Sequence, residues 1–204
     1  MPHYFDADPA APSRPAEVVL ALADLEVTLR TDRGVFSHDR VDPGTLELLR
    51  LDGPPLGPGA ADLVDLGCGY GPVAVTLARR YPGSTVWALD VNSRALELTR
   101  WNAARLGLDN IRAMPPEAVP PGVRFAGLWS NPPVRIGKAA LYGLLGDWLG
   151  RLSPGGFARL VVHKHLGGDS LAAWLAEQGL AVERLGSKRG YRLLQATRPG
   201  GARR

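Results

Sequence analysis

The chain has 204 residues, of which 45% are hydrophobic and 22% are charged, and its formal net charge at pH 7 is +4. These values are typical of a single globular domain. No apolar run approaches the roughly 20 residues that cross a bilayer, so we expect a cytoplasmic protein. The single cysteine, Cys68, excludes an intrachain disulfide and a cysteine-based zinc cluster, and of the four histidines only His163 and His165 are spaced like ligands, so no metal is expected.

Residues 1–61 are expected to form an N-terminal segment that packs on the main domain. Residues 7–15 contain three prolines, which favour an extended linker. Short strands are predicted at residues 26–29 and 34–37, separated by a turn. Asp42 and Pro43 predict a helix through about residue 50, because Asp is a favoured N-cap and Pro suits the first helical position.

From residue 62 to residue 197 the pattern alternates between strand and helix. The predicted strands span residues 63–66, 85–89, 111–114, 125–129, 158–162, 181–185 and 191–197. The predicted helices span residues 73–80, 93–106 with Ser93 as N-cap, 138–152 before a turn at 153–156, and 169–178. Such alternation is typical of a mostly parallel sheet with helices on both faces. We therefore predict an α/β, Rossmann-like fold with a seven-stranded sheet, an antiparallel C-terminal hairpin and a disordered basic tail at residues 198–204.

A glycine-rich turn, Asp65-Leu66-Gly67-Cys68-Gly69-Tyr70-Gly71, follows the first strand of the main domain. Such a turn lets a ligand approach the backbone at the carboxyl end of a sheet. Its G-x-G-x-G spacing differs from the G-x-G-x-x-G of dinucleotide-binding turns, which accommodate a pyrophosphate, so a nicotinamide dehydrogenase is disfavoured. S-adenosylmethionine carries no phosphate, and its charged amino and carboxylate groups can instead meet Asp65 and the turn amides.

Asp90 ends the second strand of the main domain, about 20 residues after the glycine turn, where an acidic residue can accept hydrogen bonds from both ribose hydroxyls of an adenosine. Asp65 and Asp90 could each be simple turn caps. Their order on consecutive strands favours an adenosine-containing cofactor instead. Cys68, within the turn, is expected to be a small packing residue.

Ser130-Asn131-Pro132-Pro133 follows the fourth strand, as the (D/N)-P-P-(Y/F/W) motif does in amino methyltransferases. An exocyclic amine on a base is a poor nucleophile because its lone pair is delocalised into the ring. Asn131 Oδ1 and the Pro132 carbonyl can accept its two N–H bonds, which favours a pyramidal nitrogen with its lone pair directed at the methyl group. The alternative is that Asn-Pro-Pro merely ends a strand.

Together with Gly34-Val35-Phe36-Ser37 and Lys188-Arg189-Gly190-Tyr191, these motifs resemble the small-domain class I methyltransferases, which include bacterial 16S ribosomal RNA guanine-N2 methyltransferases. The resemblance covers nearly the whole chain and implies that S-adenosylmethionine is the cofactor, with Asn131 and Pro132 in catalysis. The expected cofactor contacts are Phe36, Asp65, Gly67, Cys68, Gly69, Gly71, Asp90, Val91, Asn92, Met114 and Asn131. The expected substrate contacts are Pro133, Val134, Arg135, Lys138, Lys164 and Tyr191.

The chain departs from this family at Val134, where an aromatic side chain would stack on the target base. Stacking must then come from elsewhere, and Phe36 and Tyr191 are candidates, although core packing suits both equally. A second departure is Met114, near which an Asp often contacts the adenine of the cofactor; backbone amides there or Glu117 can take that role.

Arg135, Lys138 and Lys164 follow the motif or a strand end, where they can contact phosphate or be ordinary surface charge. The expected partner is therefore RNA, as ribosomal RNA or a ribosomal subunit. The leading reaction is methyl transfer to an exocyclic base nitrogen, with guanine N2 in ribosomal RNA as the first candidate. Adenine N6, a protein glutamine amide and a non-catalytic RNA-binding protein that holds the cofactor are the alternatives, and the oligomeric state is left open.

Overall fold

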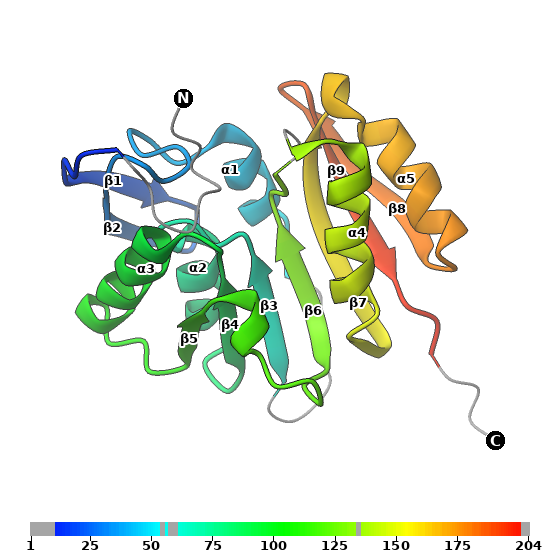
Figure 1. The fold of residues 1–204 in the computed structure, drawn as a ribbon, viewed down its shortest axis with the longest axis horizontal. Coiled ribbons are helices and arrows are strands. Elements are labelled where there is room, and N and C mark those ends of the chain that lie inside the picture. The colour runs from blue at the N-terminus through cyan, green and yellow to red at the C-terminus, as the bar shows by residue number, and fades with distance from the viewer. Residues whose placement is uncertain (1–10, 54–55, 57–60, 134–135, 201–204) are drawn as a thin grey trace.

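The computed structural model describes residues 11–53, 56, 61–133 and 136–200, and its centre is a seven-stranded sheet (Figure 1). The strands lie in the order β5-β4-β3-β6-β7-β9-β8. They span Asp62–Leu66 (β3), Thr85–Leu89 (β4), Ile111–Met114 (β5), Phe125–Ser130 (β6), Leu152–His163 (β7), Ala181–Lys188 (β8) and Tyr191–Thr197 (β9). Neighbours from β5 to β7 are parallel, whereas β9 pairs antiparallel with β7 and β8. The predicted Rossmann-like sheet with an antiparallel C-terminal hairpin is confirmed.

Helices cover both faces of this sheet. They span Pro43–Leu49 (α1), Pro72–Arg80 (α2), Ser93–Arg105 (α3), Lys138–Leu149 (α4) and Gly168–Glu177 (α5), with short 3-10 helices at Pro116–Ala118 (η1) and Lys164–Leu166 (η3). Side chains alternate between the faces, so that Leu63 lies in a core with α1, α2 and α3, and Val64 lies in a core with α4 and α5. Figure 1 shows α4 and α5 side by side on one face. Within the described residues, no helix is both long and apolar enough to cross a membrane.

The N-terminal segment differs from its prediction. β1 (Ala16–Ala21) pairs with β2 (Glu26–Thr31) in a separate antiparallel hairpin, and β1 is absent from the prediction. Val18 and Leu20 are buried, but the exposed Val19 between them is apolar as well, so the sequence shows little of the apolar–polar alternation that indicates a strand. Residues 34–37, predicted as a strand, form a turn because Gly34 and Ser37 have φ angles of 84° and 52°, outside the extended region.

Several element boundaries in the main domain also differ from the prediction, most clearly at α3 and α4. The N-cap of α3 is Asn92 rather than Ser93, since the Asn92 side chain accepts from Ala95 N at 3.2 Å. Helix α4 ends at Leu149, and the predicted turn at 153–156 belongs to an irregular part of β7. A Cβ on Gly156 would lie 2.9 Å from two carbonyl oxygens, so this irregular stretch requires glycine.

The end of the chain is more ordered than predicted. Arg198, expected in a disordered tail, donates hydrogen bonds to Gly150 O at 3.1 Å and to Leu152 O at 2.6 Å. Its backbone N donates to Gly156 O at 2.8 Å and continues the pairing of β9 with β7. Residues 201–204 of the predicted tail lie outside the described residues.

Candidate active site

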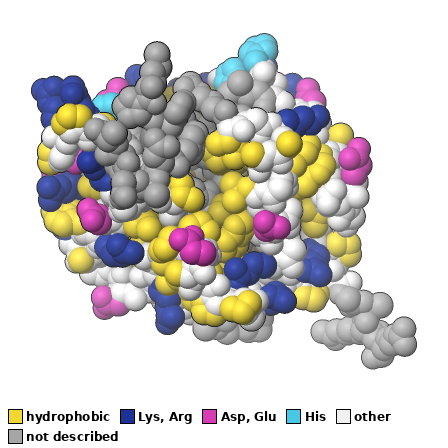
Figure 2. All heavy atoms as spheres, viewed as in Figure 1, with side chains coloured by type: hydrophobic (Ala, Val, Ile, Leu, Met, Phe, Trp, Pro, Cys, Tyr) yellow, Lys and Arg dark blue, Asp and Glu magenta, His cyan; other side chains and the backbone are white. Residues whose placement is uncertain are grey.

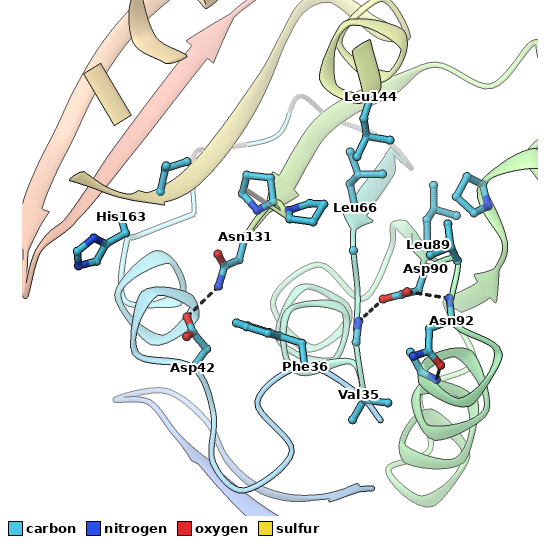
Figure 3. Close-up of a pocket in the computed structure, with 18 of the residues that line it drawn as sticks. Val35, Phe36, Asp42, Leu66, Leu89, Asp90, Asn92, Asn131, Leu144 and His163 are labelled. Atoms are coloured by element: carbon cyan, nitrogen blue, oxygen red, sulfur yellow. Dashed lines mark hydrogen bonds between the residues drawn. The ribbon is translucent and has the colours of Figure 1, made fainter. Parts of the chain in front are cut away.

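A cavity of about 270 Å³ lies at the carboxyl ends of β3, β4, β6 and β7 (Figure 3). Parallel strands bring segments that are distant in the sequence to one sheet edge, where ligands bind in open α/β sheets. The predicted site residues that line the cavity are Phe36, Gly67, Gly69, Asp90, Val91, Asn92, Asn131, Pro132, Pro133 and Tyr191. The predicted cofactor and catalytic segments therefore share one cavity.

The glycine turn passes this cavity between β3 and α2. Gly67 and Gly69 have φ angles of 82° and 56°, which residues with a Cβ rarely adopt. The backbone N atoms of Gly67 and Cys68 donate to Leu89 O at 2.8 and 2.9 Å, and so join the turn to the end of β4. Gly71, predicted as a cofactor contact, does not line the cavity and is the N-cap residue of α2.

Asp90, directly after β4, presents its carboxylate to the cavity. Asp90 Oδ2 accepts from Gly69 N at 2.9 Å, and Oδ1 accepts from Asn92 N at 3.0 Å (Figure 3). These bonds hold both oxygens in place, and the carboxylate, which can accept about four hydrogen bonds, keeps acceptor capacity for a ligand. Burial raises the pKa of Asp90 above its ordinary value. The group is thus arranged to accept from a pair of hydroxyls.

Asp65 is 1% exposed and does not line the main cavity, although it was predicted at the cofactor. Its Oδ2 accepts from Ala74 N in the first turn of α2 at 3.0 Å. The residue borders a second, smaller cavity that Gly67, Gly69 and Asn131 also line. Burial, reinforced by the charge of Asp90, raises the pKa of Asp65 to about 8. A cation in the smaller cavity would favour the ionised carboxylate.

The side-chain amide of Asn131, which follows β6, is held by the start of α1. Asn131 Nδ2 donates to Asp42 Oδ1 at 2.8 Å (Figure 3). It also donates to Thr45 Oγ1 at 3.0 Å. Because an ionised carboxylate can only accept, Asp42 determines which end of the amide faces α1 and turns Oδ1 away from it. Asp42 Oδ1 also accepts from Thr45 N at 2.9 Å as the N-cap of α1. Asn131 is thereby fixed as a hydrogen-bond acceptor at the cavity.

Aromatic rings lie on the cavity wall. Figure 3 shows the Phe36 ring between Asn131 and Asp90. His163, at the end of β7, and Tyr191, at the start of β9, also line the cavity, with their rings edge to face and 5.2 Å between centroids. Phe36 and Tyr191 were predicted site residues, whereas His163 was not, although its place at the end of a parallel strand was a signal for it. Asp42 was predicted only as a helix cap.

Several predicted contacts lie away from the cavity. Cys68 is buried with its Sγ 3.6 Å from Thr99 Oγ1 and lines only the smaller cavity. Met114 packs against the core of the face that α4 and α5 cover, while the nearby Pro116 lines the main cavity instead. Lys138 Nζ lies over the Tyr142 ring on α4, 5.3 Å from its centroid. Lys164 is exposed beside the turn between β8 and β9, whereas Val134 and Arg135 lie outside the described residues. In the part of the chain described here, no three His, Cys, Asp or Glu side chains are grouped around a possible metal position.

Sequence comparison matches residues 26–195 to the family model of the methyltransferase small domain. The chain is 30% identical over 197 residues to YbxB of Bacillus subtilis, covering 95% of this chain and 97% of that protein. It is 35% identical over 214 residues to ribosomal RNA small subunit methyltransferase C of Pseudomonas putida, covering 94% of this chain and 58% of that protein. The chain thus spans little more than half the length of that longer relative.

Structural comparison gives a similar result. The Thermus thermophilus 16S rRNA N2 G1207 methyltransferase (RsmC), solved in complex with AdoMet and guanosine, matches with a TM-score of 0.77 and 27% identity, covering 92% of this chain and 51% of that chain. A methyltransferase from Pyrococcus furiosus matches with a TM-score of 0.59 and 21% identity, covering 69% of this chain and 76% of that chain, which shows a shared fold.

Proposed function

The chain belongs to the methyltransferase small domain family, and from this membership we propose that it transfers a methyl group from S-adenosylmethionine (AdoMet) to the exocyclic N2 of a guanine in ribosomal RNA. The observation that carries the proposal is the single cavity in which the Asn131 amide, oriented by Asp42, faces the same space as Asp90 and the glycine turn. The T. thermophilus relative, solved in complex with AdoMet and guanosine, supports both the cofactor and the base.

The cavity fits the proposed cofactor. Both Asp90 oxygens are positioned by backbone donors and can accept from the two ribose hydroxyls. Gly67 and Gly69 border the cavity without side chains, so a ligand can approach their backbone. The buried Asp65 lies near enough to the turn to be ionised by the cationic amino group of the methionine part. When bound, the sulfonium supplies an electrophilic methyl group.

The residues after β6 suit the acceptor amine. Asn131 Oδ1 and the Pro132 carbonyl accept the N–H bonds of the guanine amine and direct its lone pair into the cavity. As the C–N bond forms, the methyl–sulfur bond breaks and the positive charge passes from sulfur to the amine, where acceptors held in advance stabilise it. The methylated amine then loses one N–H proton to solvent. The Asp42 carboxylate, bonded to Asn131, adds a negative charge behind the acceptor. Holding the two reactants in line can lower the barrier by up to roughly 7–11 kcal/mol.

Transfer of tritium from methyl-labelled AdoMet to 16S ribosomal RNA, followed by nucleoside analysis, tests this proposal. We expect the label in N2-methylguanosine for the wild type, and incorporation about 10²–10³-fold slower for Asn131→Ala. Free RNA and isolated small subunits are compared in parallel to identify the form of the substrate. Label found in N6-methyladenosine or in a protein glutamine would show that the acceptor is not guanine. AdoMet binding without transfer to any acceptor would indicate a non-catalytic role.

A further inference from the structure

We propose that Lys164, Lys188 and Arg189 form a phosphodiester-binding site at the turn between β8 and β9, which holds the RNA strand that brings the target base to the cavity. The proposal rests on the function proposed above and names the contact that makes RNA, rather than a free nucleoside, the substrate. None of the three residues lines the cavity; they lie around Tyr191 and His163, which do.

Strand pairing brings these cations together. Lys188 pairs with Tyr191 across the turn, and Tyr191 pairs with His163 across β9 and β7. Lys164 follows His163 directly, and its backbone N donates to Gly190 O at 2.8 Å. Lys164 therefore adjoins His163 in the chain, and Lys188 lies opposite Tyr191 across the turn, so that cations stand next to both rings on the cavity wall.

A buried carboxylate fixes the turn against α1. Glu47 is 2% exposed, and its oxygens lie 3.2 Å from Lys188 Nζ, 3.9 Å from Arg189 Nε and 2.6 Å from an Arg50 nitrogen. A buried carboxylate is unfavourable unless it is paired, so these contacts hold α1 and the turn together. The side chains of Lys188 and Arg189 nevertheless remain 63% and 65% exposed. Glu47 neutralises only one of the positive charges of Arg50, Lys188 and Arg189, so net positive charge remains at the surface to bind a phosphate.

The turn between β8 and β9 packs closely against the rings on the cavity wall. Arg189 and Gly190 have φ angles of 50° and 87°, as the central residues of a type I′ hairpin turn do. A Cβ on Gly190 would lie 2.9 Å from His163 Nε2, so the turn packs directly on that ring. A Cβ on Gly44 of α1 would lie 2.6 Å from the Tyr191 ring, so that ring is held from the other side. The distance between the rings and the cations is therefore set by packing rather than by flexible side chains alone.

The rings of His163 and Tyr191 on the cavity wall suit the base of a nucleotide, and the cations outside the cavity suit its phosphate. An unpaired base can stack on His163 or Tyr191, which is the contact that RNA-binding proteins use for single-stranded bases. The flanking phosphates then face Lys164, Lys188 and Arg189, where charge neutralisation contributes affinity without sequence preference. Figure 2 shows histidine side chains at the upper rim of the molecule, close to where Figure 1 places the upper end of β7 and the turn.

The test compares two double variants with equal loss of charge. Lys188→Gln/Arg189→Gln removes the proposed site, whereas Arg79→Gln/Arg124→Gln removes two exposed arginines from the end of α2 and the segment before β6, at the opposite edge of the sheet. The probe is a labelled, single-stranded, guanine-containing RNA oligonucleotide, titrated at several salt concentrations. Methyl transfer is measured in parallel on 16S ribosomal RNA and on free guanosine. Lys164→Gln provides a second variant that leaves the Glu47 ion pairs intact.

We expect the turn variant to bind RNA at least about tenfold more weakly. Its salt slope should be smaller by about 1.4, because each phosphate of a single strand that a cation neutralises contributes roughly 0.7 to that slope. Its AdoMet affinity and its transfer to guanosine should equal those of the wild type, and Lys164→Gln should reduce RNA affinity in part. Equal reductions in the turn variant and in the control pair would overturn the proposal. A wild type that binds RNA through these residues but transfers no methyl group would refute the proposed function and leave this site in place.

Discussion

Asn131 Nδ2 and Asp42 Oδ1 are 2.8 Å apart, and this hydrogen bond joins the residue after β6 to the N-cap of α1 across 89 positions of the chain. Asp42 accepts from the Asn131 amide and from Thr45 N with the same oxygen, so one carboxylate both starts a helix and orients the proposed catalytic acceptor. The helix cap and the active site are therefore coupled, and substitutions can separate their contributions.

Asp42→Asn should separate the two roles of this residue. Asparagine caps a helix about as well as aspartate, so the stability of the fold should change little. The neutral amide no longer fixes the orientation of Asn131 and removes the negative charge behind the acceptor, so kcat should fall by about one to two orders of magnitude with little change in KM. Steady-state kinetics and thermal unfolding measure both effects. Asp42→Ala is the control that also loses the cap, at about 1 kcal/mol. Wild-type kcat in Asp42→Asn would contradict the role assigned here.

Asn131→Ala should lower the rate of methyl transfer by about 10²–10³-fold while AdoMet binding persists, because one preorganised hydrogen bond of this kind contributes about that much. Asn131→Asp keeps an acceptor but places a second carboxylate beside Asp42, so we expect it to be impaired. The double variant Asp42→Asn/Asn131→Asp restores a single carboxylate in the pair and should recover part of the activity. If the double variant is no better than Asn131→Asp alone, the two side chains do not act together.

Asp90→Ala should weaken AdoMet binding by at least about tenfold, because hydrogen bonds to a charged group typically contribute roughly 1.5–3 kcal/mol each. Isothermal titration calorimetry with AdoMet and its demethylated product measures this effect. The control is Asp109→Ala, which removes an exposed carboxylate outside the cavity. Unchanged affinity in Asp90→Ala, or binding of a nicotinamide dinucleotide by the wild type, would refute the cofactor site.

Asp65 should make the free energy of unfolding depend on pH. Its pKa of about 8 in the folded protein lies above that of an unfolded aspartate, near 3.9, so between these values the folded state binds the extra proton. The contribution of Asp65 to the free energy of unfolding is then greatest below about pH 4 and falls as pH rises towards 8, by at most about 1.4 kcal/mol per pH unit. Asp65→Asn keeps an acceptor for Ala74 N but cannot titrate, so its stability should fall less over this range. Urea unfolding of both proteins from pH 5 to 8 measures the difference, and parallel pH dependences would show that Asp65 is ionised in the fold.

Local sequence patterns were sufficient for the framework of the site. The strand and helix periods predicted the main sheet, and parallel strands necessarily place their carboxyl ends together, so Gly67, Asp90 and Asn131 could be assigned to one sheet edge. The same patterns misassigned residues 34–37, because the positive φ of Ser37 reflects its surroundings and has no strong local signal.

The contacts between segments that are distant in the sequence were decided only by the tertiary structure. Asp42 was recognisable as a helix cap, but its bond to Asn131 depends on how α1 packs against the sheet. His163 enters the cavity because β7 lies beside β6, and Lys138 lies away from it because α4 turns that side chain over Tyr142. A sequence specifies periodicity and turns over a few residues, whereas the neighbours of a side chain across the cavity are determined by the packing of whole elements.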